Sequence, residues 1–257
     1  MFIDRVSHSK LDTFRECHYK YFAKYHEHLP EKRSDSALQF GSYIHKILEV
    51  GVREFTLSAL ELIAEEQKNT YKFDHKEYPD KLIRKCLVNF IEFNTKLQES
   101  EIIGLELKEE FKIDDFMYTG IIDRVVKAKD GSIMLIDYKT SKREKTKLDL
   151  YMDKQLIGYA TTLHKNLKIP INKIVCAHFY PITGNFVSIS YTDTQKSSFL
   201  KEVRNLVWSI RKKKKEEFSA SRNKFCNWCQ FYYCCPLYNT PEQAAHNINE
   251  AKKEQNG

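Results

Sequence analysis

The stretch that decides the fold is Gly120-Ile121-Ile122-Asp123-Arg124-Val125-Val126, followed after a short polar turn by Ile133-Met134-Leu135-Ile136-Asp137-Tyr138-Lys139. Both runs are apolar and rich in β-branched residues, and the Asp130-Gly131 pair between them is a strong hairpin signal. Side chains alternate between the two faces of a strand, so Asp137 and Lys139 share one face. The sequence therefore predicts a β-hairpin that carries two carboxylates and a lysine.

The length of the turn decides whether Asp123 lies with the other two charged groups. A two-residue turn at Asp130-Gly131 would place Asp123 opposite Tyr138 and direct its carboxylate to the other face. A three-residue turn, Lys129-Asp130-Gly131, would place Asp123 opposite Asp137. The second turn requires a left-handed backbone at its last residue, and glycine adopts that conformation without steric cost. We therefore predict the three-residue turn, with both carboxylates and the lysine on one face.

Two carboxylates on adjacent strands form a hard-oxygen site that suits Mg²⁺ or Mn²⁺. Such an ion can polarise a phosphodiester and lower the pKa of a bound water, and a neighbouring lysine can orient that water or offset developing charge. The alternative is an edge strand with an ordinary ion pair. However, Asp137 follows four apolar residues, where an unpaired charge is costly to bury. This position favours the metal site.

Composition narrows the class of protein. The chain has 257 residues, 42% hydrophobic and 30% charged, as is typical of globular proteins. No apolar run approaches the ~18 residues that can span a membrane. Met1 to Arg5 are not followed by the apolar core that a signal peptide has. We therefore expect a cytoplasmic protein with no membrane partner. The net charge of +7 favours a polyanionic partner.

A second group of residues suggests another metal site. Cys226, Cys229 and Cys235 form a C-x2-C-x5-C pattern, with Cys234 beside the last of them. In a chain without a secretion signal, such cysteines indicate metal ligands rather than disulfides, and soft thiolates suit zinc or an iron–sulfur cluster. Cys17 is the candidate fourth ligand, although a single cysteine on a helix is more often a small core residue. A structural zinc knuckle is the alternative.

The remaining sequence predicts an α/β protein with a mixed central β-sheet flanked by helices. We expect one domain, with a mainly helical part at 1–100, a catalytic core at 101–195, a long helix and cysteine-rich segment at 196–238, and a frayed polar tail at 239–257. Leu150 to Leu163 is expected to be one helix. His45 lies on an apolar helix face, where a histidine is more often a core residue than a ligand.

These motifs together resemble the PD-(D/E)XK nucleases, specifically the RecB-like branch with a C-terminal iron–sulfur cluster, which includes CRISPR-adaptation exonucleases and AddB-type nuclease domains. The resemblance spans nearly the whole chain. It rests on segments that follow the family's order, namely Ser9-x-Leu11 with Phe14 and Cys17, Gly41-x3-His45, Gly120 to Asp123, Ile136 to Lys139, Gln155-x3-Tyr159, and Cys226, Cys229 and Cys235.

The resemblance implies a restriction-endonuclease-like core and a role for each matching residue. The catalytic residues would be Asp123, Asp137 and Lys139. The ligands of Mg²⁺ or Mn²⁺ would be His45, Asp123, Asp137 and the Tyr138 carbonyl. DNA would be positioned by Gln155 and Tyr159. A 4Fe-4S cluster would be held by Cys17, Cys226, Cys229 and Cys235, with Cys234 left over.

This sequence departs from the family pattern at two places. Position 137 is Asp where many members have Glu. The family often has a further Glu on the preceding strand, and the sequence leaves Glu106 and Glu110 as alternatives. In addition, the chain has no G-x4-G-K-[ST] helicase motif, so we expect a standalone nuclease or one that works with separate partners.

The resemblance implies a metal-dependent deoxyribonuclease, an exonuclease that acts on single-stranded DNA or DNA ends in a prokaryotic, archaeal or viral host cell. Helicases, recombinases and CRISPR-adaptation proteins are the partners it suggests. One alternative is a catalytically quiet DNA-end-binding or scaffolding subunit of a recombination or CRISPR-adaptation complex. Another is a zinc-stabilised binding module with an incidental D-x-K.

Overall fold

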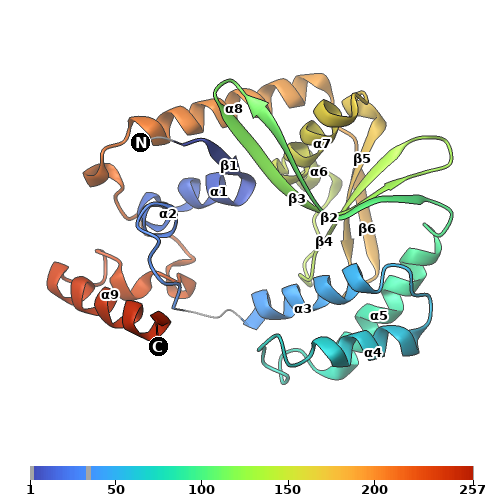
Figure 1. The fold of residues 1–257 in the computed structure, drawn as a ribbon, viewed down its shortest axis with the longest axis horizontal. Coiled ribbons are helices and arrows are strands. Elements are labelled where there is room, and N and C mark those ends of the chain that lie inside the picture. The colour runs from blue at the N-terminus through green and yellow to red at the C-terminus, as the bar shows by residue number, and fades with distance from the viewer. Residues whose placement is uncertain (1–2, 33–35, 257) are drawn as a thin grey trace. The chain divides into compact units, whose positions relative to one another are not determined.

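The computed structural model describes residues 3–32 and 36–256. Its elements in chain order are shown in Figure 1: β1 (Arg5–Ser7), α1 (His8–Glu16), α2 (His18–Tyr25), α3 (Ser36–Val50), α4 (Leu57–Gln67), α5 (Asp80–Thr95), β2 (Glu101–Ile113), β3 (Phe116–Lys127), β4 (Ile133–Tyr138), α6 (Lys147–Tyr151), α7 (Lys154–Leu167), η1 (Ile171–Lys173), β5 (Ile174–Tyr180), β6 (Asn185–Ile189), α8 (Asp193–Lys212), η2 (Lys215–Glu217), η3 (Cys226–Trp228), η4 (Tyr232–Cys234) and α9 (Pro241–Asn256).

The chain divides into two compact units. One is continuous and runs from Ser36 to Lys201, and the other combines Met1–Asp35 with Glu202–Gly257. Each unit is described by itself below. The assignment of the whole chain to a single nuclease domain stays a prediction.

The Ser36–Lys201 unit is built on a mixed sheet. Among its described residues, five strands pair in the order β2-β3-β4-β5-β6, with β4 and β5 parallel and the other pairs antiparallel. Helices α3, α4 and α5 lie on one side of the sheet (Figure 1), and their apolar stripes pack on Ile136, Tyr138 and Phe179. Helix α7 packs along β2, β3 and β5. The predicted fold class, a mixed sheet flanked by helices, is confirmed.

The predicted hairpin register is also confirmed. Strands β3 and β4 pair Arg124 with Ile136, and the next pair in the same register sets Asp123 opposite Asp137. The turn holds three residues, and Gly131 within it has a φ of +82°. The strand pairing and the left-handed glycine therefore agree on a single register.

We predict that Gly131→Ala lowers the free energy of unfolding by about 1 to 2 kcal/mol, because a Cβ atom disfavours the left-handed conformation by that amount. No atom lies within 4 Å of the position of that Cβ, so the effect is confined to the backbone. Urea denaturation measures it. Gly131→Asn is the matched control and should cost less, since asparagine tolerates this conformation better; equal stability of all three proteins would contradict the prediction.

The C-terminal segment differs from its prediction. Residues 239–257 are expected to be a frayed polar tail, whereas the structure has helix α9 there. At the start of this helix, the side chain of Gln243 accepts a hydrogen bond from the Thr240 N–H, and the side chain of Thr240 accepts one from the Gln243 N–H. Ala244 and Ile248 then pack against the buried cluster that includes Phe231. The apolar stripe is too sparse to be recognised without this packing partner.

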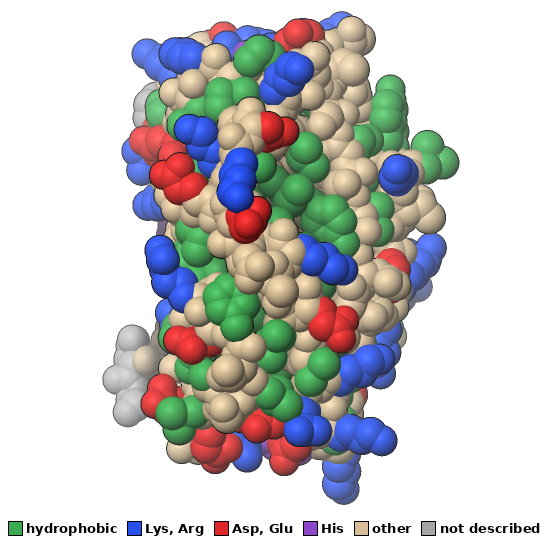
Figure 2. Space-filling view, turned by 90° about the vertical axis from the view of Figure 1, so that its right-hand side faces the viewer, with side chains coloured by type: hydrophobic (Ala, Val, Ile, Leu, Met, Phe, Trp, Pro, Cys, Tyr) green, Lys and Arg blue, Asp and Glu red, His purple; other side chains and the backbone are tan. Residues whose placement is uncertain are grey.

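None of the described helices combines the length and the apolarity that crossing a bilayer requires. Figure 2 shows one face of the molecule, on which Lys and Arg side chains are scattered among acidic and apolar ones. The net charge of +7 is therefore not gathered into a continuous basic band on this face.

Candidate active site

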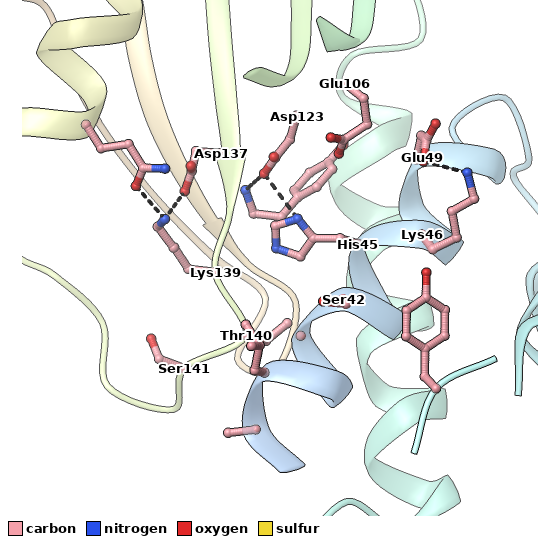
Figure 3. A pocket seen from close by; sticks show the side chains of 16 residues that line it. Ser42, His45, Lys46, Glu49, Glu106, Asp123, Asp137, Lys139, Thr140 and Ser141 are labelled. Carbon is pink, nitrogen blue, oxygen red and sulfur yellow. Dashed lines mark hydrogen bonds and ion pairs between the residues drawn. The ribbon is translucent and has the colours of Figure 1, made fainter. Parts of the chain in front are cut away.

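The residues predicted from the hairpin and from α3 meet at one cavity of about 620 Å³ in the Ser36–Lys201 unit (Figure 3). It lies where β3, β4 and the N-terminal half of α7 approach α3. Its lining includes the ionisable or amide side chains of His45, Glu106, Asp123, Asp137, Lys139 and Gln155. The structure thus brings together residues that are up to 110 positions apart, from His45 to Gln155.

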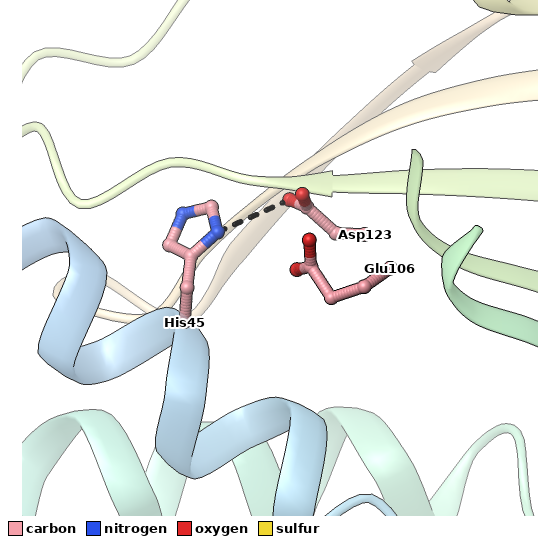
Figure 4. A group of neighbouring side chains, drawn as sticks. All are labelled: His45, Glu106 and Asp123. Atoms are coloured by element: carbon pink, nitrogen blue, oxygen red, sulfur yellow. Dashed lines mark ion pairs between the residues drawn. The ribbon is translucent and has the colours of Figure 1, made fainter. Parts of the chain in front are cut away.

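Three of these side chains form a possible metal-binding group (Figure 4). His45, Glu106 and Asp123 each offer one ligand atom, and these atoms all lie within 4.8 Å of one another. The Asp123 carboxylate lies 3.4 Å from His45 Nδ1, and its Oδ2 accepts a hydrogen bond of 2.7 Å from the Tyr138 N–H. Carboxylate oxygens together with an imidazole nitrogen are a donor set that holds divalent metal ions.

The structure distinguishes the two glutamates that the sequence leaves open. Glu106 lines the cavity and Glu110 does not. The strand register pairs residues 105 and 107 with 124 and 122, which sets Glu106 across from Asp123. Its backbone has a φ of +43°, which is rare for a residue other than glycine, and such strain is concentrated at functional sites. Burial and the charge of Asp123 raise the pKa of Glu106.

Asp137 and Lys139 form a close ion pair beside this group. Asp137 is 2% exposed, and its Oδ2 lies 2.6 Å from Lys139 Nζ. Burial raises the pKa of Asp137 to about 6, against the lowering effect of the Lys139 charge. Burial alone would lower the pKa of Lys139, but the charges of Asp137 and Asp123 outweigh it and raise that pKa. Lys139 is therefore a charged donor at neutral pH.

Helix α7 supplies a hydrogen-bonded chain that holds Lys139. Lys139 Nζ donates to Gln155 Oε1 over 3.0 Å, and Gln155 Nε2 donates to the Tyr159 hydroxyl over 2.9 Å. The glycine at position 120 makes room for this chain, because a Cβ there would lie 2.7 Å from the Tyr159 ring. The predicted pair Gln155 and Tyr159 therefore lies beside the predicted lysine.

The helix that carries this pair begins later than the sequence suggests. One helix is expected from Leu150 to Leu163, but α6 ends at Tyr151 and α7 starts at Lys154. Asp153 caps α7, since its Oδ1 accepts hydrogen bonds from the N–H groups of Gln155 and Leu156. This cap fixes the first turn of α7, from which Gln155 reaches Lys139.

Sequence reasoning missed one residue of this region, His178. It lies on β5, pairs with Asp137 across the parallel strands and is 0% exposed. Its Nε2 lies 3.6 Å from the Asp137 carboxylate and 3.8 Å from that of Asp153. Burial and the nearby Lys139 charge lower the pKa of His178 to about 4, so the ring is neutral at pH 7. The available signal was a histidine inside an otherwise apolar strand.

The second predicted site lies in the other unit. Cys17 ends α1, and the C-terminal cysteines lie in the turns around η3 and η4. The structure lines one small cavity with the four cysteines predicted to be ligands, Cys17, Cys226, Cys229 and Cys235. Cys234 is buried and does not line it. All are free thiols, and burial raises the pKa of Cys229 and Cys235.

The spacing of these thiols bears on the choice of metal. Among the described residues, no three cysteine sulfurs lie within 4.8 Å of one another. Zinc bonds of about 2.3 Å in a tetrahedron would bring all four sulfurs to roughly 3.8 Å apart. Four thiols around one cavity are the kind of soft ligands that both zinc and iron–sulfur clusters use.

Comparison with known proteins agrees with this fold. The crystal structure named "Putative exonuclease" from Eubacterium rectale has the same fold, with a TM-score of 0.53 and 14% sequence identity. The match covers 88% of this chain and 87% of that one. Residues 5–236 match the family model of the PD-(D/E)XK nuclease superfamily. The chain belongs to this superfamily.

Two relatives are named as subunits of an ATP-dependent helicase/deoxyribonuclease. The protein of Streptococcus agalactiae serotype Ia is 24% identical over 270 residues, which cover 97% of this chain and 24% of the relative. That of Streptococcus pyogenes serotype M49 is 24% identical over 192 residues, which cover 68% of this chain and 18% of the relative. The chain therefore spans about a quarter or less of the length of these relatives.

The pKa values predict the pH dependence of metal binding. A carboxylate must be ionised to bind a cation, and the pKa of Asp137 is raised to about 6. We expect the affinity of this site for Mn²⁺ to fall by at least about tenfold per unit below pH 6. The raised pKa of His45, whose proton also competes with the metal, acts in the same direction. Calorimetric titration between pH 5 and pH 8 measures this; equal affinities at pH 5 and pH 7 would contradict it.

Proposed function

We propose that this protein is a Mg²⁺- or Mn²⁺-dependent deoxyribonuclease, an exonuclease that hydrolyses single-stranded DNA or DNA ends. The observation that supports it best is the convergence of the acidic residues and Lys139 on one cavity. In this proposal the catalytic residues are Asp123, Asp137 and Lys139. The metal ligands are His45, Asp123, Asp137 and the Tyr138 carbonyl, and Glu106 adds a further carboxylate.

Each side chain has a role that follows from its contacts. A divalent cation held there would polarise the phosphodiester and lower the pKa of a water molecule. Lys139 is held by Asp137 and Gln155, so its ammonium group is positioned to donate a hydrogen bond to the attacking water or to a phosphate oxygen. Gln155 and Tyr159 keep Lys139 in place and contact the DNA backbone. The hydrogen bond between them limits the rotamers available to both side chains.

DNA is the proposed substrate and a helicase the proposed partner. The net charge of +7 favours a polyanion, and the relatives described above are named as helicase/deoxyribonuclease subunits. Those relatives do not support a CRISPR-adaptation partner. A catalytically quiet scaffolding role stays an alternative, since the names of the relatives place them in a larger assembly.

We also propose that Cys17, Cys226, Cys229 and Cys235 hold a 4Fe-4S cluster. Its role is structural, because the ligands come from the two chain segments that make up one unit. Anaerobically purified protein should be brown and contain iron. Colourless protein with one bound zinc would instead support the zinc knuckle.

The decisive experiment is digestion of labelled single- and double-stranded DNA with Mn²⁺, using substrates whose 5′ end, 3′ end or both ends are blocked. An exonuclease is expected to degrade DNA whose free end matches its polarity and to spare DNA with both ends blocked. Binding should weaken as salt rises, because phosphate contacts release counterions. Cleavage of fully blocked DNA would rule out the exonuclease, and activity that appears only with a helicase present would favour a role inside a larger complex.

A further inference from the structure

We propose that His178 is a positioning residue, which orients the Asp137 carboxylate for metal binding from the buried side of the site. This inference rests on the proposed metal site but not on the identity of its substrate. His178 does not line the cavity and has no access to solvent. It therefore acts only through the groups that it touches inside the protein.

Those groups form a buried network behind the cavity. The Nε2 atom of His178 lies between the carboxylates of Asp137 and Asp153, at 3.6 and 3.8 Å. Asp153 is itself paired with Lys145, with 2.6 Å between Oδ2 and Nζ. On the other side of the ring, Nδ1 lies 3.3 Å from the Tyr180 hydroxyl. The imidazole thus lies between Asp137, which lines the cavity, and the ion pair of Asp153 with Lys145.

The hydrogen bonds define which nitrogen carries the proton. The Tyr180 hydroxyl accepts a hydrogen bond of 2.9 Å from the Lys145 N–H, so its own hydrogen is available to donate to His178 Nδ1. A neutral ring that accepts at Nδ1 carries its hydrogen on Nε2. That N–H lies on the side of the two carboxylates, at 3.6 and 3.8 Å, which is longer than a hydrogen bond, so it acts on Asp137 electrostatically.

The consequence for Asp137 is geometric. Its Oδ2 faces Lys139 and His178, which leaves Oδ1 as the oxygen that can turn to the cavity. Without the imidazole, this buried carboxylate keeps its ion pair with the flexible Lys139 but loses its polar neighbour on the side away from the cavity. Groups that orient a metal-binding carboxylate in this way typically change metal affinity by about 10- to 100-fold when they are removed.

The test compares Mn²⁺ affinity, measured by electron paramagnetic resonance without DNA, in wild type and two variants of the full chain. His178→Leu should weaken binding by about 10- to 100-fold, whereas His178→Gln, whose amide N–H can replace that of Nε2, should stay within about threefold of wild type. The melting temperature of the metal-free proteins is recorded in parallel. Equal Mn²⁺ affinity of wild type and folded His178→Leu would overturn the role of His178.

A second pair of variants decides the question if His178→Leu does not fold. Tyr180→Phe removes the donor to Nδ1 and should weaken Mn²⁺ binding. Tyr43→Phe is the matched control, because its buried hydroxyl donates to the Ala64 carbonyl and does not touch His178. Equal affinity of these two variants would also overturn the proposal. Failure of the wild type to bind Mn²⁺ would instead reject the metal site itself, so the two outcomes are distinguishable.

Discussion

Asp137→Asn is expected to reduce DNA hydrolysis by about 10³-fold while the protein stays folded. Asparagine keeps the size of the side chain but removes the buried negative charge, which is the property that binds a cation. Metal stabilisation of a transition state is worth several kcal/mol, and 1.36 kcal/mol corresponds to about tenfold in rate. Lys139→Ala should have an effect of similar size, since it removes the donor that Gln155 and Asp137 hold at the cavity.

The measurement is the initial rate of release of labelled nucleotide from DNA with Mn²⁺ at saturation. The matched controls are Asp80→Asn and Lys173→Ala, which alter exposed residues of the same unit outside the cavity, and both should retain full activity. The double variant of Asp137 and Lys139 should be little worse than either single variant, because the two side chains act as one unit. If the single variants keep wild-type rates, the site is assigned wrongly.

Loss of one predicted cluster ligand should destabilise the protein before it affects the chemistry. Cys17→Ala would release the N-terminal segment from the C-terminal cysteines and open a loop of about 200 residues. A cross-link that closes a loop of more than 100 residues contributes on the order of 4 to 5 kcal/mol. We therefore expect a large fall in melting temperature, with Mn²⁺ binding unchanged in the molecules that remain folded.

Cys234→Ala is the control for this effect. Cys234 is as buried as any cysteine of that segment but does not line the cavity, so its variant should keep its iron and lose only a small packing contribution. Iron content, visible absorption and thermal unfolding under anaerobic conditions separate the two variants. A Cys17→Ala protein that is stable but inactive would contradict the structural role of the cluster.

The hairpin could be predicted because local and tertiary preferences coincide there. The glycine at position 131 requires a particular turn, and that turn requires the register that sets Asp123 opposite Asp137. The approach of His45 and Gln155 to this hairpin follows from helix packing, which no local pattern encodes. It was expected only because the motifs resemble those of a known family.

Other parts of the site could not be predicted for identifiable physical reasons. Glu106 faces the cavity through a left-handed backbone that its residue type disfavours, so periodicity could not separate it from Glu110. His178 lies in an apolar strand, where a histidine is usually read as part of the core. Its place in the site depends on the neighbouring parallel strand β4, which brings Asp137 beside it. Helix α9 depends likewise on a distant packing surface.

The division of the chain into a continuous unit and a split one has a consequence for biosynthesis. All of Ser36–Lys201 is synthesised before Glu202, so this unit can begin to fold while the ribosome is still at work. Cys17 cannot meet Cys235 until Cys235 has been translated. At a translation rate of about 5 to 20 residues per second, that delay is roughly 10 to 40 s. During this time the aromatic side chains of α1 and α2 lack their later partner Phe218. The nascent N-terminal segment therefore keeps part of its aromatic surface uncovered until Phe218 has been made.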